Sequence, residues 1–218
     1  MPDIKAAIRQ ALEADDLDAV ASLARKDRKV LSQLVRLAYD KETLAGWRAI
    51  KAIGRSAKEM VNKDYAFLRE TIRKQLWSLN DESGGIGWSA PEIVGEIVSC
   101  APDRFRDIIP LLAQVYDVDE VVFRPGVLYA LATIAEVLPT AVEPYTNLAV
   151  KALSDENAMV RVRGLEIIRL LRDLLSDTDR AAVMREMPRL LSDQSEVWIY
   201  KNSHFINIQV KEAAEETV

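Results

Sequence analysis

Apolar residues along most of the chain recur at three- and four-residue intervals, the spacing of amphipathic helices, and the helical stretches follow one another in pairs. Within each pair an aspartate ends the first stretch and precedes the second. These aspartates are Asp40, Asp81, Asp117, Asp155 and Asp193, and their spacings are 41, 36, 38 and 38 residues. A repeat of about 40 residues made of two helices is typical of an α-helical repeat array.

The repeats can be aligned on these aspartates, and the aligned columns differ in character. The column nine residues after each aspartate is small in four of five cases, which would let a neighbouring helix approach closely, and the column eleven residues after is polar in four of five, which predicts a solvent-facing position. The columns twelve and thirteen residues after each aspartate are entirely apolar and predict a buried helix face. The apolar positions are Ala52, Ile53, Ile93, Val94, Tyr129, Ala130, Ile167, Ile168, Phe205 and Ile206.

Two segments give the repeats a family resemblance. Asp155 followed by Val160-Arg161, and the run WRAIKAIG from Trp47 to Gly54, resemble the HEAT-repeat superfamily, particularly its bacterial PBS-lyase HEAT-like type. The resemblance implies an all-α fold, a right-handed α-solenoid of about five to six antiparallel helix pairs. We expect one domain over residues 1–218, with capping helices in 1–27 and repeats at 28–62, 63–101, 102–139, 140–176 and 177–214. The consensus is poorly kept at Gly84 to Trp88 and at Val197 to His204.

Composition narrows the classes of function. The net charge of −5 and the pI near 5.1 disfavour a protein that coats nucleic acid, since phosphate binding needs cations. Cys100 is the only cysteine, which excludes an internal disulfide and favours a reducing compartment. The first residues do not resemble a signal peptide, and the most apolar stretch, Val127 to Leu138, is too short to span a bilayer. We therefore expect a cytoplasmic protein that does not bind membranes.

Catalytic chemistry finds little support in the residue types. His204 is the only histidine, so one chain cannot form a histidine metal cluster. Cys100 and His204 lie three repeats apart, which is too far for a nucleophile and its base. The sequence predicts no catalytic residue, no metal and no cofactor.

A glycine-rich segment between Asn80 and Glu92 is the most unusual part of the chain. Ser89 and Glu92 have the spacing of a helix capping box, and Pro91 suits a first helical turn. A glycine-rich loop that enters a helix can present backbone N–H groups to an anion, although this one lacks the ending of a P-loop. Two interpretations stay open, a long turn between helices or a ligand loop formed by Ser83, Gly84, Gly85, Gly87 and Ser89.

A stripe along the second helices is the strongest candidate for a binding surface. In HEAT solenoids the second helices line the concave face, where partners usually bind. The positions seven, eight and eleven residues after the aspartates are rich in aromatics and cations, with five cations against two carboxylates, and aromatic residues and Arg are enriched at binding hot spots. The alternative is that the aromatics fill gaps between helices and the cations are paired or solvated. The stripe consists of Trp47, Arg48, Lys51, Trp88, Glu92, Arg124, Arg163, Glu166, Tyr200, Lys201 and His204.

These observations favour a non-catalytic interaction or scaffold module that binds a protein or an acidic peptide through its concave face. A nucleic-acid-binding protein or a DNA glycosylase-like HEAT enzyme is the alternative, since Trp47, Trp88, Arg124 and Glu92 or Glu166 could stack on a base and stabilise its positive charge. A prosthetic-group lyase or chaperone-like factor rests on the family label alone.

Overall fold

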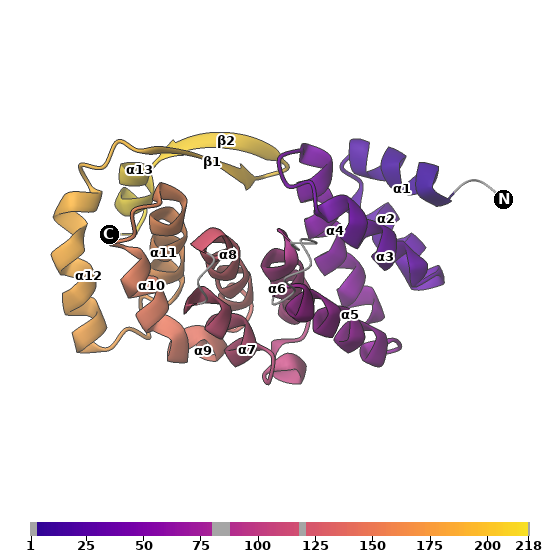
Figure 1. Cartoon of the computed structure of the whole chain (residues 1–218), viewed down its shortest axis with the longest axis horizontal. Helices are drawn as coiled ribbons and strands as arrows, with labels where there is room; N and C mark the ends of the chain where they lie inside the picture. The colour runs from indigo at the N-terminus through magenta and orange to yellow at the C-terminus, as the bar shows by residue number, and fades with distance from the viewer. Residues whose placement is uncertain (1–3, 80–87, 118–120, 218) are drawn as a thin grey trace. The chain divides into compact units, whose positions relative to one another are not determined.

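The computed structural model describes residues 4–79, 88–117 and 121–217, and these residues fold into helices joined by short turns (Figure 1). Apart from one β-hairpin near the C-terminus, every regular element among them is helical, which confirms the predicted all-α class. The chain divides into two compact units, Met1–Phe105 and Arg106–Val218.

The first unit is a stack of helices in which neighbours along the chain pack in pairs. Helix α4 is the longest and contacts α2, α3 and α6, so it forms the centre of the unit. Helix α2 starts at Asp16, whose carboxylate accepts a hydrogen bond from the Ala19 N–H, and α4 starts at Thr43, whose hydroxyl accepts one from the Gly46 N–H. The elements are α1 (Ile4–Glu13), α2 (Leu17–Lys26), α3 (Lys29–Ala38), α4 (Leu44–Met60), α5 (Tyr65–Ser78), α6 (Ala90–Ser99) and a 3₁₀ turn at Pro102–Phe105.

Two glycines of α4 permit close approaches in this unit. A Cβ at Gly46 would lie 1.8 Å from the Asp40 carbonyl oxygen, so the turn before α4 folds directly onto the helix. A Cβ at Gly54 would lie 2.1 Å from Oε2 of Glu96, so the Glu96 carboxylate of α6 occupies the space beside Gly54. Any larger residue at either position must displace its neighbour.

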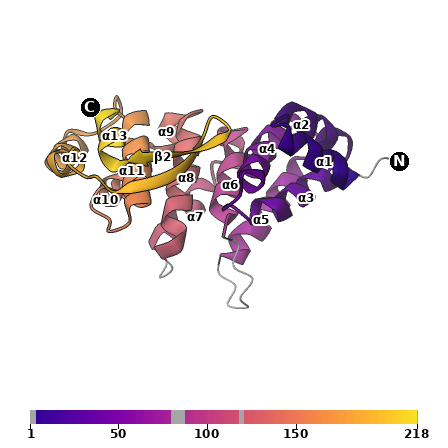
Figure 2. The same cartoon turned by 90° about the horizontal axis from the view of Figure 1, so that it is seen from above.

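The second unit continues the helix pairs and ends in a hairpin and a short helix. Helix α11 packs against α8 and α10, and α13 lies beside α11 and α12 (Figures 1 and 2). The helices are α7 (Ile109–Gln114), α8 (Arg124–Ala135), α9 (Pro139–Val142), α10 (Thr146–Ala152), α11 (Ala158–Leu170), α12 (Asp177–Leu190) and α13 (Val210–Glu215), with 3₁₀ turns at Val115–Asp117, Val121–Phe123 and Glu143–Tyr145 and strands β1 (Glu196–Lys201) and β2 (His204–Gln209).

The hairpin replaces a predicted helix. We expected a second helix over the end of repeat 177–214, with Tyr200, Lys201 and His204 on its partner-binding face, and this prediction is wrong. The two strands pair antiparallel through a two-residue turn, in which Asn202 and Ser203 have φ of 50° and 69°. This geometry is that of a type I′ turn, whose twist suits a hairpin. The segment forms strands because β-branched and aromatic residues are concentrated on both sides of the turn, in Val197 to Tyr200 before it and in Phe205 to Ile208 after it.

The aligned columns hold in the helical repeats with one exception. All eight apolar-column residues from Ala52 to Ile168 are buried, and the small column does allow close packing, since a Cβ at Gly164 would lie 2.8 Å from that of Ala152. The polar column is not uniformly exposed, because Glu92 and Leu128 are buried. None of the helices in the described ranges is long and apolar enough to span a membrane.

Candidate functional site

In the first unit, the stripe residues on α4 mainly contact other parts of the protein. Trp47 is buried, with an exposed fraction of 9%. The guanidinium of Arg48 donates hydrogen bonds to the carbonyl oxygens of Leu12 and Glu13, at 3.0 and 2.9 Å, and lies 3.4 Å from the Asp15 carboxylate. Arg48 therefore fastens the turn between α1 and α2 onto α4.

The N-terminal end of α6 contains a buried polar cluster. Lys41 Nζ donates to the Trp88 carbonyl oxygen at 2.8 Å and to Glu92 Oε1 at 2.9 Å. Glu92 is only 3% exposed, so the expectation that it faces solvent is wrong. The predicted capping box is also wrong: Ser89 precedes the helix, but its side chain makes no cap hydrogen bond, and the Glu92 carboxylate binds Lys41. Pro91 does lie in the first helical turn.

Trp88 is the stripe residue of this unit that stays open to solvent, at 46% exposed. It adjoins the glycine-rich segment, of which Ser83, Gly84, Gly85 and Gly87 lie outside the described residues. Ser89 of the same proposed ligand loop is buried, and its hydroxyl has no hydrogen-bond partner in the described part of the chain.

Stripe residues of the second unit are likewise in contact with one another or with nearby helices. Arg124 lies 2.9 Å from Asp155 and over the Tyr116 ring, at 5.4 Å from its centroid. Arg163 is buried, pairs with Glu166 at 2.7 Å and lies 5.1 Å from the Tyr129 ring centroid. Tyr200 contacts Phe205 edge to face across the hairpin, and His204 Nδ1 lies 2.9 Å from the Asn202 carbonyl oxygen in the turn.

The pairing of the cations changes the electrostatics of the stripe. Each of the five cations counted in it has a carboxylate of this chain within 4.0 Å, namely Arg48 with Asp15, Lys51 with Glu96, Arg124 with Asp155, Arg163 with Glu166 and Lys201 with Glu216. The excess of positive charge that the sequence suggested is therefore largely neutralised. Whether these residues bind a partner stays a prediction.

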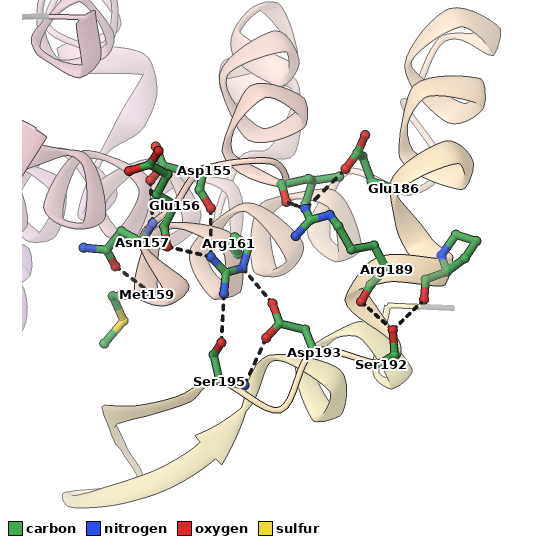
Figure 3. Close-up of polar contacts among 12 residues, drawn as sticks. Asp155, Glu156, Asn157, Met159, Arg161, Glu186, Arg189, Ser192, Asp193 and Ser195 are labelled. Carbon is green, nitrogen blue, oxygen red and sulfur yellow. Dashed lines mark hydrogen bonds and ion pairs between the residues drawn. The ribbon is translucent and has the colours of Figure 1, made fainter.

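Arginine–aspartate pairs join successive repeats, and of their four residues only Arg124 belongs to the predicted stripe. The guanidinium of Arg161 on α11 donates to Asp193 Oδ2 at 2.8 Å, to the carbonyl oxygens of Asp155 and Glu156 at 2.8 Å each, and to Ser195 Oγ at 3.1 Å (Figure 3). Arg124 reaches Asp155 in the same manner one repeat earlier. Two of the aspartates that set the period, Asp155 and Asp193, thus receive an arginine from the preceding repeat, whereas Asp117 pairs with Lys151. Arg124 and Arg161 follow the aspartates of their own repeats, Asp117 and Asp155, by seven and six residues, and this spacing is the signal in the sequence.

Among the side chains with shifted pKa values, Cys100, Tyr116 and Asp193 are shielded from solvent. Burial raises the pKa of the Cys100 thiol to about 12 and that of Tyr116 to about 12, so Cys100 is not a thiolate nucleophile at neutral pH. Burial also opposes ionisation of Asp193, but hydrogen bonds from Ser195 and the charge of Arg161 outweigh it and lower the pKa of this carboxyl. Asp193 therefore serves as an ionised partner for Arg161.

Within the described residues, no group of three or more His, Cys, Asp or Glu side chains is placed to hold a metal ion. No protein-family model matches the sequence, and no curated protein matches it. Among solved structures the chain is similar to an archaeal HEAT-like repeats protein from Thermococcus onnurineus NA1, with 16% identity, a TM-score of 0.48, and coverage of all of this chain and 80% of that one. The bacterial PBS-lyase type suggested by the sequence stays a prediction.

Proposed function

We propose that the chain is a non-catalytic interaction module, and that its β-hairpin contacts a partner protein through Trp198. The observation that carries this proposal is the exposure of that side chain: Trp198 is 63% exposed at the centre of β1, whereas its neighbours Val197 and Ile199 are buried. Strand alternation fixes the indole on the outer face, so it is presented on a defined element and not on a loose end.

The surroundings of Trp198 suit a protein contact. Asn207 lies directly across the hairpin from it, and the Asn207 amide donates to Glu196 Oε2 at 3.2 Å. The Gln209 amide lies 3.5 Å from the other oxygen of the same carboxylate. An aromatic anchor beside polar side chains is the arrangement of an interface hot spot, in which the polar neighbours exclude water from the anchor.

The repeat framework supports the non-catalytic part of the proposal. Two of its buried or half-buried ion pairs, Lys41–Glu92 and Arg161–Asp193, hold a turn against a helix. The alternative of a base-binding enzyme gains no observation, since Trp47 is buried and Glu166 is paired with Arg163. The second-helix stripe remains a predicted further contact for the partner.

Photo-cross-linking tests the proposal directly. Replacing Trp198 by the photoreactive residue benzoylphenylalanine is expected to give a discrete cross-linked protein in the source cells. Met184 on α12, also exposed, provides the matched control position, and the same substitution there is expected to give none. Trp198→Ala should weaken capture of the cross-linked protein about tenfold or more. The same products at both positions, or none at position 198, would refute the proposal.

A further inference from the structure

A groove between α1 and α3, the first helices of two successive helix pairs, has a composition unlike the stripe. The two helices contact each other, and the groove between them encloses about 200 Å³. It has an apolar floor and a basic rim. Its lining consists of Lys5, Ile8 and Arg9 from α1 and of Gln33, Arg36 and Leu37 from α3.

Two arginines of this groove, unlike the cations of the stripe, have no carboxylate partner in the described part of the chain. Helices α1 and α3 together carry four cations, Lys5, Arg9, Lys29 and Arg36, against one carboxylate, Glu13, in a chain of net charge −5. Among the residues that the structure describes, no carboxylate lines the groove. In the described part of the chain, the guanidinium groups of Arg9 and Arg36 make no hydrogen bond or ion pair, and both side chains are exposed.

We infer that the α1–α3 groove binds an acidic segment of a partner protein in which carboxylates flank an aliphatic side chain. A guanidinium presents a planar fork that matches a carboxylate, and the groove has one on each wall, Arg9 on α1 and Arg36 on α3. The nearly fully buried Ile8 and the half-buried Leu37 give an aliphatic side chain a floor to cover.

The volume of the groove and its apolar floor disfavour a drug-sized anion and a nucleic acid as its ligand. The volume lies below the roughly 300 Å³ at which sites for drug-sized molecules begin, so the groove suits one side chain with its flanking groups. Nucleic acid derives most of its affinity from neutralising several phosphates, and three cations over an apolar floor are poorly matched to that task.

This inference rests on the proposed function, since it names the chemistry of a protein partner. It concerns the first unit, whereas Trp198 lies in the second. The two surfaces can therefore be disabled separately.

A designed peptide provides the test. Fluorescein-labelled Glu-Glu-Leu-Leu-Glu-Glu is titrated against the whole protein at low salt, and its anisotropy is followed. The Arg9→Glu/Arg36→Glu variant is expected to bind at least about tenfold more weakly, since two charge-assisted contacts become repulsive. The Arg9→Lys/Arg36→Lys variant should fall between the two, because it keeps the charge and loses the fork. Thermal unfolding of all variants should match wild type, as the two arginines are exposed.

The control variant is Arg25→Glu/Lys26→Glu on α2, which makes the same change of net charge outside the groove lining. It should bind as wild type does, apart from a small loss that salt removes. The inference is overturned if the peptide does not bind, if the control variant loses as much affinity as the groove variant, if Gln-Gln-Leu-Leu-Gln-Gln binds equally well, or if a single-stranded oligonucleotide binds more tightly than the peptide. If the peptide binds the groove but position 198 gives no cross-link, the inference stands and the proposed hairpin contact is refuted. If position 198 gives a cross-link but the peptide does not bind, the hairpin contact stands and the inference is refuted.

Discussion

The turns that follow Asp155 and Asp193 have the same construction and lead to different structures. Each aspartate accepts an arginine from the preceding repeat, at 2.9 Å from Arg124 and at 2.8 Å from Arg161. Each also accepts, through Oδ1, the backbone N–H two residues on, at 2.9 and 3.0 Å. Yet the chain after Asp155 enters helix α11, and the chain after Asp193 enters strand β1. At Asp155 and Asp193 the aspartate therefore determines how successive repeats are joined. It does not determine whether a helix or a strand follows.

The residues after the turn decide that element. Asn157 accepts a hydrogen bond from the Met159 N–H and starts α11, whose apolar residues continue at helical spacing. After Ser195 the side chains alternate between buried and exposed, and the turn at Asn202 and Ser203 returns the chain as a second strand.

The largest expected effect comes from breaking the joint itself. Arg161→Ala leaves the Asp193 carboxylate without its buried partner and should lower the free energy of unfolding by about 3 kcal/mol. Urea denaturation measures the loss. Arg185→Ala, an exposed position on α12, is the control and should change stability by less than about 0.5 kcal/mol. Equal effects of the two substitutions would show that the joint does not stabilise the unit.

The second prediction tests the close packing of α11, the helix that follows Asp155, against α10. In Gly164→Ala the new Cβ meets Ala152 at 2.8 Å and the Ala149 carbonyl oxygen at 3.0 Å, so α10 and α11 must separate. The expected loss is about 2 kcal/mol, again measured by urea denaturation. Adding Ala152→Gly should restore part of that loss, and no restoration would mean that Ala152 is not the obstacle.

Acid titration sharpens the account of Asp193. Its pKa is lowered in the folded state, so its ionised form contributes stability above the unfolded pKa of about 4, and that stability is lost as the pH falls through the lower folded value. Asp193→Asn should cost about 1.5 kcal/mol at neutral pH, as a hydrogen-bonded charge is lost. The difference from wild type should shrink on acidification below about pH 4. A difference that stays constant down to low pH would contradict this assignment.

The smallest effect concerns the hairpin. Ser203 has a φ of 69°, a conformation that glycine adopts without steric cost. Ser203→Gly should therefore stabilise the protein by about 0.5 kcal/mol, seen as a rise of roughly 1–2 °C in Tm. Ser203→Val should lower Tm, because a β-branched residue is strained at positive φ. Destabilisation by both substitutions would argue against the type I′ turn.

Sequence patterns were sufficient for the buried faces of the helices and insufficient for their surfaces. Apolar columns predicted the buried faces of the helices because helical spacing alone determines them. The stripe was overestimated as a basic surface because the carboxylates that pair with Arg48, Lys51 and Lys201 come from other elements, Asp15, Glu96 and Glu216. Counting the charges at aligned positions of the repeats does not include carboxylates that other elements bring next to these cations.

The hairpin was missed for another reason. Its β-branched and aromatic residues and its two-residue turn lie within Val197 to Ile208, where the period of 38 residues predicts a helix instead. The α1–α3 groove had no sequence signal, because residues of two helices line it and their register is set by packing.

The equivalence of the turns at Asp155 and Asp193 also has a consequence for how the number of repeats can change. The two aspartates are 38 residues apart and make equivalent bonds. A tandem duplication of residues 155–192 would therefore keep the arginine–aspartate pairs: the first copy of Asp155 would accept Arg124, the first copy of Arg161 would pair with the second Asp155, and the second copy of Arg161 would pair with Asp193. Strand β1 contains no arginine six or seven residues after Asp193, so the series of arginine–aspartate pairs in the described residues stops at this turn.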